Sequence, residues 1–238
     1  MTLAARPSAT TGPGAAVLAM LLLLAAGCSN RGANDRSGAR GSAAPDTLLA
    51  TLSPRLADWI ALWQLAAPAV RAESLLWASS GPLALADIRA FQPRSAEAAR
   101  RLAWFAALAP DSARAVDADT CYDFDPASNA FHRGPPRFSC AILMDLKINS
   151  VATLDTCGAG AEFDGALWLG PERFALTGAT TDGDTTGAGR GFVRLYDLGA
   201  GTVTEYRLPR VVPAVFQRFH TEREIARIAR LRRLAAGG

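Results

Sequence analysis

Four aspartates lie close together near the middle of the chain and form a group of side chains that could do chemistry. They are Asp117, Asp119, Asp123 and Asp125. Carboxylate oxygens are the ligands that Ca²⁺ takes in proteins, so this segment is a weak candidate for a calcium site. It lacks the ligand order and the closing glutamate of the known calcium-binding loop. A solvated turn, with aspartates at caps and bends, is therefore favoured, and neither a metal nor another cofactor is expected.

Two histidines and one pair of carboxylates are the remaining candidates for acid–base chemistry. A triad-type hydrolase needs a base, usually histidine, beside its nucleophile. His132 lies in a loop rich in proline and glycine, and His220 is expected just before the last helix. Glu162 and Asp164 alternate in a strand-like segment, so they share a face and form the best pair for a glycosidase. No sequence signal places any of these side chains beside a nucleophile.

The chain lacks the common catalytic and nucleotide-binding motifs. No G-x-S-x-G, H-E-x-x-H or Walker-type loop occurs. The glycine-rich segment 187–191 precedes a strand rather than a helix, so it lacks the context that binds phosphate. The formal net charge is only +3, and the basic residues form no recognisable nucleic-acid motif. Nucleic acid is therefore not an expected partner.

An apolar segment ends at the first cysteine of the chain. Residues 17–28 read V-L-A-M-L-L-L-L-A-A-G-C, and Arg6 precedes them. The apolar run is too short to cross a hydrocarbon layer of ~30 Å, which needs about 20 residues, but it suits a signal-peptide core. The segment resembles the signal peptide and lipobox of bacterial lipoproteins. It differs at Ala25, where that family most often has leucine.

The resemblance implies where the chain resides. It implies cleavage before Cys28 and lipids on the cysteine sulfur and the new amino terminus, which together hold a protein stably on a membrane. Ser29, rather than aspartate, follows the cysteine, and in the family this favours the outer over the inner membrane on the periplasmic side. The alternative is an ordinary secretory signal with an incidental thiol at Cys28.

Three further cysteines allow one disulfide in an oxidising compartment. A bridge between Cys121 and Cys140 is favoured because the loop between them carries turn signals. A bridge between Cys140 and Cys157 is the alternative, and three free thiols remain a third possibility. Zinc is not expected because the chain has two histidines and no C-x-x-C spacing.

Composition and periodicity divide the chain into five segments. They are the signal peptide at 1–27, a flexible tether at 28–46, a helical region at 47–116, an antiparallel β region at 117–215 and a C-terminal helix at 216–238. In the helical region, Ser53 begins a helix that runs to Ala67 and buries a stripe containing Trp59 and Trp63. Further helices are predicted over 70–77, 83–91 and 95–110, with a turn over 79–82.

The β region shows apolar runs and alternation typical of strands. Strands are predicted over 140–148, 150–156, 162–169, 173–177, 192–198 and 202–208, with the last two forming a hairpin. In the C-terminal helix, Thr221 and Glu224 form a capping box. Its apolar arc of Ile225, Ile228 and Leu231 is expected to dock on the domain, while Arg223, Arg230 and Arg233 are solvated. Alternatively, this basic amphipathic helix lies on an anionic membrane surface.

These patterns predict an α+β fold. A helical N-terminal half packs on one antiparallel meander of five or six strands, and a C-terminal amphipathic helix follows. The favoured function is a non-catalytic binding or accessory subunit, lipid-anchored in the cell envelope, whose partner is an envelope protein. The alternatives are a periplasmic hydrolase of unknown substrate and a purely structural envelope protein.

Overall fold

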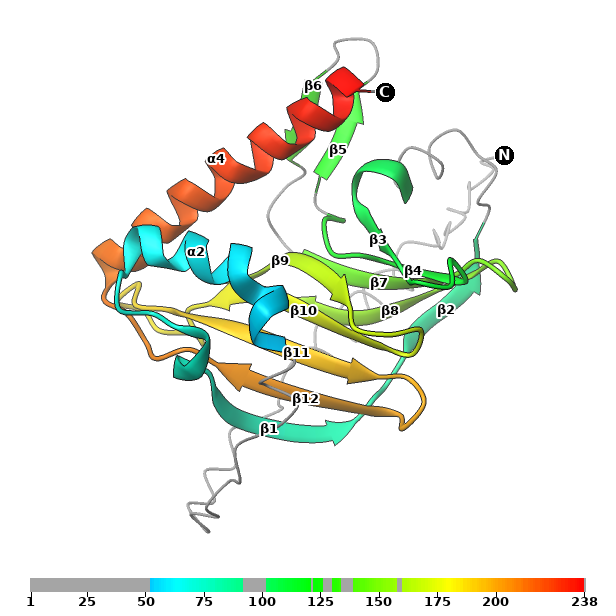
Figure 1. Cartoon of the computed structure of the whole chain (residues 1–238), viewed down its shortest axis with the longest axis horizontal. Helices are drawn as coiled ribbons and strands as arrows, with labels where there is room; N and C mark the ends of the chain where they lie inside the picture. The colour runs from blue at the N-terminus through cyan, green and yellow to red at the C-terminus, as the bar shows by residue number, and fades with distance from the viewer. Residues whose placement is uncertain are drawn as a thin grey trace, which may run out of the picture. The chain divides into compact units, whose positions relative to one another are not determined.

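Two antiparallel β-sheets dominate the part of the chain that the computed structural model describes. This part comprises residues 52–91, 102–120, 122–125, 130–133, 139–157 and 160–237. Sheet A has five strands in the order β1-β12-β11-β10-β9, and sheet B has five in the order β2-β8-β7-β4-β3 (Figure 1). Strands β5 and β6 pair with each other as a separate hairpin.

The helices are η1 (Ser53–Leu56), α2 (Ala57–Ala66), η2 (Ala72–Ser74) and α4 (Pro213–Gly237). The strands of sheet A are β1 (Leu76–Pro82), β9 (Ala161–Trp168), β10 (Arg173–Thr180), β11 (Arg190–Asp197) and β12 (Thr202–Arg207). The strands of sheet B are β2 (Ala86–Ala90), β3 (Ala106–Leu108), β4 (Arg114–Asp117), β7 (Ser139–Asp145) and β8 (Ser150–Cys157). The hairpin consists of β5 (Tyr122–Asp125) and β6 (Ala130–Arg133).

The predicted helical N-terminal half is wrong. The first helix is confirmed as η1 and α2, with Trp59 and Trp63 buried. Residues predicted as helices over 70–77 and 83–91, and as a turn over 79–82, instead form η2, β1 and β2. Of the helix predicted over 95–110, residues 102–104 are helical, β3 replaces its end, and residues 95–101 lie outside the described residues. Short apolar runs fit helix and strand equally well, and pairing in the sheets decided between them.

The six strands predicted in the C-terminal half are confirmed, but the single meander is wrong. Strands β9 to β12 follow one another as neighbours in sheet A, whereas β7 and β8 pair in sheet B. Strand β1, from the N-terminal half, pairs along the outer edge of β12. The segment 117–125, expected as a turn, contains the end of β4 and all of β5. His132 lies in β6 rather than in a loop.

The two sheets pack face to face around an apolar core. Alternate residues of β10 point to opposite faces of sheet A, as strand geometry requires. Phe174 and Leu176 point to sheet B, whereas Ala175 and Ala179 point to the helices. Within the core the rings of Phe174 and Tyr196 stack with centroids 4.9 Å apart. The indole nitrogen of Trp168 donates a hydrogen bond to the carbonyl of Ala107, which ties β9 to β3.

One charged cluster crosses the space between the sheets. Arg194 of β11 pairs with Asp155 of β8 at 2.5 Å and with Glu205 of β12 at 2.7 Å. The hydroxyl of Tyr196 also donates to Asp155. Burial by itself would raise the pKa of Glu205, but Arg194 and Arg207 together bring it below its ordinary value. Both carboxylates are committed to Arg194, so the cluster links the sheets.

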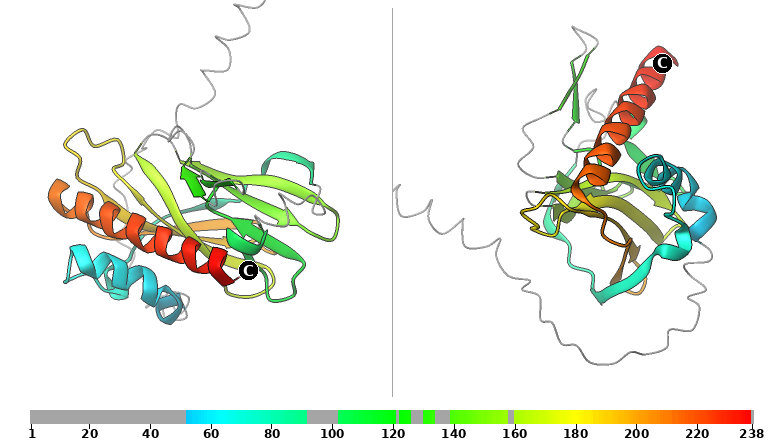
Figure 2. Two further views of the ribbon diagram at one scale, coloured as in Figure 1. Left: turned by 90° about the horizontal axis from the view of Figure 1, so that it is seen from above. Right: turned by 90° about the vertical axis from the view of Figure 1, so that its left-hand side faces the viewer.

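Helices α2 and α4 lie side by side on the face of sheet A that is turned away from sheet B (Figure 2). The rings of Trp63 and Phe219 stack with centroids 3.8 Å apart. Trp59 packs against Gly191 of β11, and Phe216 packs against Gly189, which immediately precedes β11. A Cβ at either glycine would come within 3.0 Å of these rings, so the glycine-rich segment serves helix packing.

Helix α4 starts earlier than the sequence predicts. It begins at Pro213, so Thr221 and Glu224 lie inside it and form no capping box. The Thr221 hydroxyl instead donates to the carbonyl of Gln217, one turn earlier. Within the described ranges, no helix has both the length and the apolar character needed to span a membrane.

Because Trp63 stacks on Phe219, replacing Trp63 is expected to lower stability far more than replacing the exposed Trp77. Trp63→Ala is expected to lower the free energy of unfolding by about 3–5 kcal/mol, because it removes a fully buried ring between α2 and α4. Trp77→Ala, at a side chain that is 62% exposed, is expected to change it by about 0.5 kcal/mol. Urea unfolding followed by circular dichroism measures both, and equal losses would contradict this packing.

Candidate functional site

The candidate site is a cavity of about 480 Å³ between α2, α4 and sheet A. Helix α2 supplies an apolar wall, β9 and β10 supply the floor, and α4 supplies the opposite wall. The lining residues are Asp58, Trp59, Ala61, Leu62 and Leu65 from α2, Asp164 and Thr177 from the sheet, and Arg223, Ala226, Arg227 and Arg230 from α4. Cavities of a few hundred cubic ångströms with apolar walls and a few polar groups are typical of small-molecule sites.

Asp164 joins the two helices to the floor of the cavity. It lies on β9, and its Oδ2 accepts a hydrogen bond of 2.9 Å from the indole nitrogen of Trp59. Its Oδ1 lies 3.1 Å from Nη1 of Arg223. Trp59 is itself held on sheet A by its contact with Gly191. The position of α2 over the cavity is therefore fixed by a polar contact and an apolar one.

Arg223 is the charged side chain most enclosed by this site, with 3% of its surface exposed. Besides Asp164, its guanidinium pairs with Glu162 of β9 and lies 3.4 Å from Glu224 of α4. Burial by itself would lower the pKa of Arg223, but Asp164 and Glu162 raise it overall, so the side chain stays charged. Its Nε atom is buried and has no hydrogen-bond partner among the described residues.

Arg227, one turn further along α4, continues this buried row. It donates to the backbone carbonyl of Phe163 at 2.9 Å and pairs with Asp119 at 2.9 Å. Arg230 reaches the other oxygen of Asp119 at 2.7 Å. Three arginines of α4 are thus bound by carboxylates from β9, from the segment after β4 and from α4 itself. Their positive charge is already neutralised inside the protein.

The aspartate cluster does not form the expected solvated turn. Asp117 and Asp119 are buried, and Oδ1 of Asp117 accepts a hydrogen bond from the backbone N–H of Asp119. Asp119 is directed at the arginines of α4, which sequence spacing could not show. Asp123 and Asp125 lie in β5, and their side chains are outside the described residues. Where the structure describes side chains, it shows no group of three or more acidic, histidine or cysteine residues that could hold a metal ion.

Glu162 and Asp164 share one face of β9, as their alternation predicts. The same guanidinium, that of Arg223, binds both of them. A glycosidase needs one carboxyl group as an acid and a second as a base or nucleophile, both open to the sugar. In this arrangement the two carboxylates instead serve as partners of a buried cation. The geometry therefore favours a structural and binding role for this pair.

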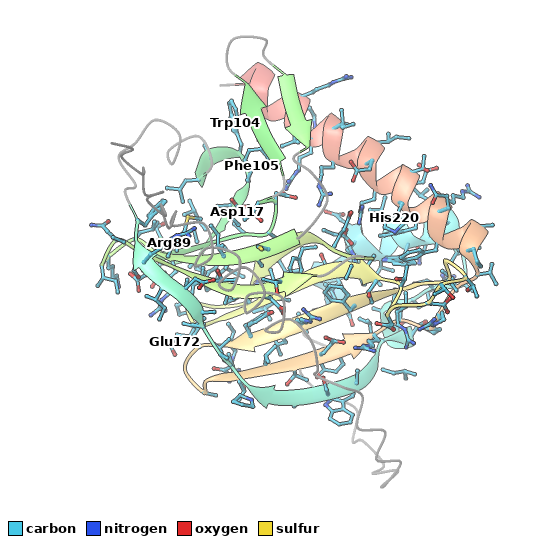
Figure 3. The ribbon with its side chains drawn as sticks, turned by 180° about the vertical axis from the view of Figure 1, so that it is seen from behind. Arg89, Trp104, Phe105, Asp117, Glu172 and His220 are labelled. Carbon is cyan, nitrogen blue, oxygen red and sulfur yellow. The ribbon has the colours of Figure 1, made fainter. Side chains whose placement is uncertain are left out.

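His220 belongs to α4 and does not precede it (Figure 3). Its ring meets that of Phe216 edge-on, with centroids 4.4 Å apart. Burial, together with the neighbouring Arg223, lowers the pKa of His220 below its ordinary value, although Glu162 and Asp164 oppose the shift. The imidazole is therefore neutral at neutral pH. It packs against the rings of Phe216 and Phe219.

Cys140 carries a free thiol in the structure, although both predicted bridges include it. The ladder between β7 and β8 places Thr156 opposite Cys140, and it places Cys157 opposite Ser139. Cys121 lies outside the described residues. Burial, with a smaller contribution from Asp155, raises the pKa of the Cys140 thiol, so it stays protonated. The register of the ladder, which local sequence does not reveal, decided the neighbours of this cysteine.

The sequence interpretation also missed which face of α4 is buried. Arg223 and Arg227 are buried, whereas Ile225 and Ile228 of the predicted docking arc are exposed. Leu231 alone of that arc is buried, in contact with Phe105. A signal was present, because Phe216, Phe219, Arg223 and Arg227 follow one another at helical spacing. Arginines on a helix normally indicate an exposed face, because charged side chains are seldom buried without partners.

Comparisons with known proteins do not assign the chain to a family. The chain matches no protein-family model, no curated protein and no solved structure. The site is therefore interpreted from its own residues.

The lowered pKa of His220 predicts how stability depends on pH. Between the folded-state and unfolded-state pKa values, the unfolded chain binds more protons than the folded chain. The contribution of the neutral His220 to stability is therefore complete above about pH 6.5. It is lost as the pH falls toward the folded-state value.

Urea unfolding between pH 5 and pH 7.5 tests this prediction, with His220→Gln as the comparison. The parent chain is expected to lose more stability on acidification than the variant, since other titrating groups contribute equally to both. Parallel pH profiles for the two proteins would contradict the assignment.

Proposed function

We propose that the chain is a non-catalytic binding subunit of the cell envelope and that its binding site is the cavity between α2 and α4. One observation carries this proposal. The arginines of the cavity are paired with carboxylates of the protein itself, while Ala61, Leu62, Leu65 and Ala226 present apolar surface. Such a site can bind a molecule through its apolar surface without using its arginines.

The chemistry of the lining also indicates the class of ligand. An anionic ligand would have to compete with Asp119, Glu162, Asp164 and Glu224 for the three arginines. A neutral, mainly apolar ligand requires no such exchange. Apolar surface that leaves water contributes roughly 25 cal/mol per Å², so the apolar wall of the cavity favours a molecule that covers it. We therefore assign the site to a neutral apolar ligand of small-molecule size.

The residues around Cys28 support the location in this proposal. A lipid anchor at that cysteine, on the periplasmic side of the outer membrane, would keep the cavity within the envelope. An envelope protein would then be the partner that delivers or receives the ligand. The hydrolase alternative gains no support from Glu162, Asp164 or His220, since each is committed to packing or to an ion pair.

Filling the cavity tests the binding site. The neutral fluorescent probe N-phenyl-1-naphthylamine is expected to bind saturably to the compact unit that begins at Pro45. Ala226→Trp places a large ring in the cavity and is expected to weaken binding at least tenfold, which corresponds to about 1.4 kcal/mol. Ala214→Trp, on an exposed position of the same helix, is the matched control. Equal binding by both variants, with unchanged circular dichroism, would refute the site.

The anchor has its own test. In a bacterial host, the full chain is expected to incorporate labelled palmitate and to fractionate with membranes, because an acylated cysteine holds it there. Cys28→Ser is expected to abolish the labelling, whereas Cys140→Ser, which removes a thiol within sheet B, is expected to retain it. Palmitate on the Cys28→Ser chain, or none on the parent chain, would contradict lipidation at this position.

A further inference from the structure

Helix α4 has an exposed face that carries two isoleucines between two arginines. Its outward residues Arg218, Thr221, Ile225, Ile228 and Arg232 recur at spacings of three and four, so they lie on one side of the helix. We call this face the outer stripe. Ile225 is 59% exposed and Ile228 is 43% exposed. The stripe is therefore apolar at its centre and basic at both ends.

The neighbouring helix continues this surface. α2 and α4 lie side by side on sheet A (Figure 2). Leu65 of α2 is 50% exposed and lines the same cavity as Ala226, the chain neighbour of Ile225. Arg233 is also exposed. The acidic groups of this helical layer outside the buried ion pairs are Asp58 and the half-buried Glu222.

Helix α4 docks on sheet A with arginines buried and with two isoleucines exposed. Burying an isoleucine side chain stabilises a protein, and α4 gives up this gain at two positions. It buries Arg223 and Arg227 instead, which requires matching carboxylates on β9 and after β4. The two isoleucines therefore remain accessible at the surface of the protein.

We propose that the outer stripe of α4 lies on an anionic lipid surface. Ile225 and Ile228 enter the headgroup region, and Arg218 and Arg232 bind lipid phosphates. The two arginines are fourteen residues apart, which is ~21 Å along a helix, so the stripe is long enough to lie along a flat surface. Basic amphipathic helices bind such interfaces through buried apolar area together with attraction to anionic headgroups.

This contact is independent of the acyl anchor and of the ligand. An anchored chain could present the cavity to the periplasm without the outer stripe touching lipid. In the proposed orientation the two-helix layer faces the membrane.

A depth measurement on the full chain tests the proposal. Ile225→Cys is labelled with an environment-sensitive fluorophore, and the unsubstituted chain gives the background from the natural thiols. The labelled chain is reconstituted in vesicles containing phosphatidylglycerol and a spin-labelled lipid that quenches fluorophores near the headgroups. Glu172→Cys is the matched control, since Glu172 is exposed and lies on the opposite side of the structure from His220 of α4 (Figure 3).

The expected result is quenching at position 225 and little quenching at position 172. In vesicles of phosphatidylcholine alone, quenching at 225 is expected to fall, because attraction to anionic lipid is lost. Adding Arg232→Glu is expected to weaken the contact at least about fivefold, whereas Arg89→Glu, an exposed change of equal charge on β2, leaves it unchanged.

Three outcomes would overturn the proposal. The first is equal quenching at positions 225 and 172. The second is quenching at position 225 that changes neither with lipid charge nor with Arg232→Glu. The third is shielding of position 225 without vesicles that grows with protein concentration, since a second copy of the chain would then cover the stripe.

Discussion

Arg223 and Arg227 are buried on the inner side of α4, and each can remain there only because carboxylates bind it. A buried guanidinium without partners would lose several kilocalories per mole of hydration, so α4, β9 and the segment after β4 must be placed together. Asp164 and Glu162 hold Arg223, and Asp119 holds Arg227. The position of α4 therefore depends on charges from two distant parts of the chain, which is a stricter requirement than apolar packing alone.

This requirement connects the cavity to the outer surface of the helix. Because the arginines point inward, the α4 wall of the cavity is polar and its charges are already balanced, whereas the α2 wall is mainly apolar. For the same reason the isoleucines point outward. Both features follow from the way α4 is rotated about its own axis.

Sequence periodicity correctly predicted the elements whose formation depends on residues close together in the chain. The stripe of Trp59 and Trp63 predicts the first helix, and alternation predicts the six strands of the C-terminal half and their last hairpin. Each of these depends on neighbours within a few residues. Local patterns were a poor guide to β1 and β2, because these edge strands are largely exposed and carry no clear alternation of buried residues. Pairing with β12 and β8, which are distant in sequence, stabilises them.

The sequence by itself determined the elements whose own residues repeat at the right period, together with the alternation that puts Glu162 and Asp164 on one face. Only the tertiary structure decided that Asp119 is buried, that Cys140 lies opposite Thr156, and that α4 turns its arginines inward. Each of these facts depends on pairing between residues far apart in the chain. The free energy of a buried charge is set by the partners that reach it, and no local spacing encodes those partners.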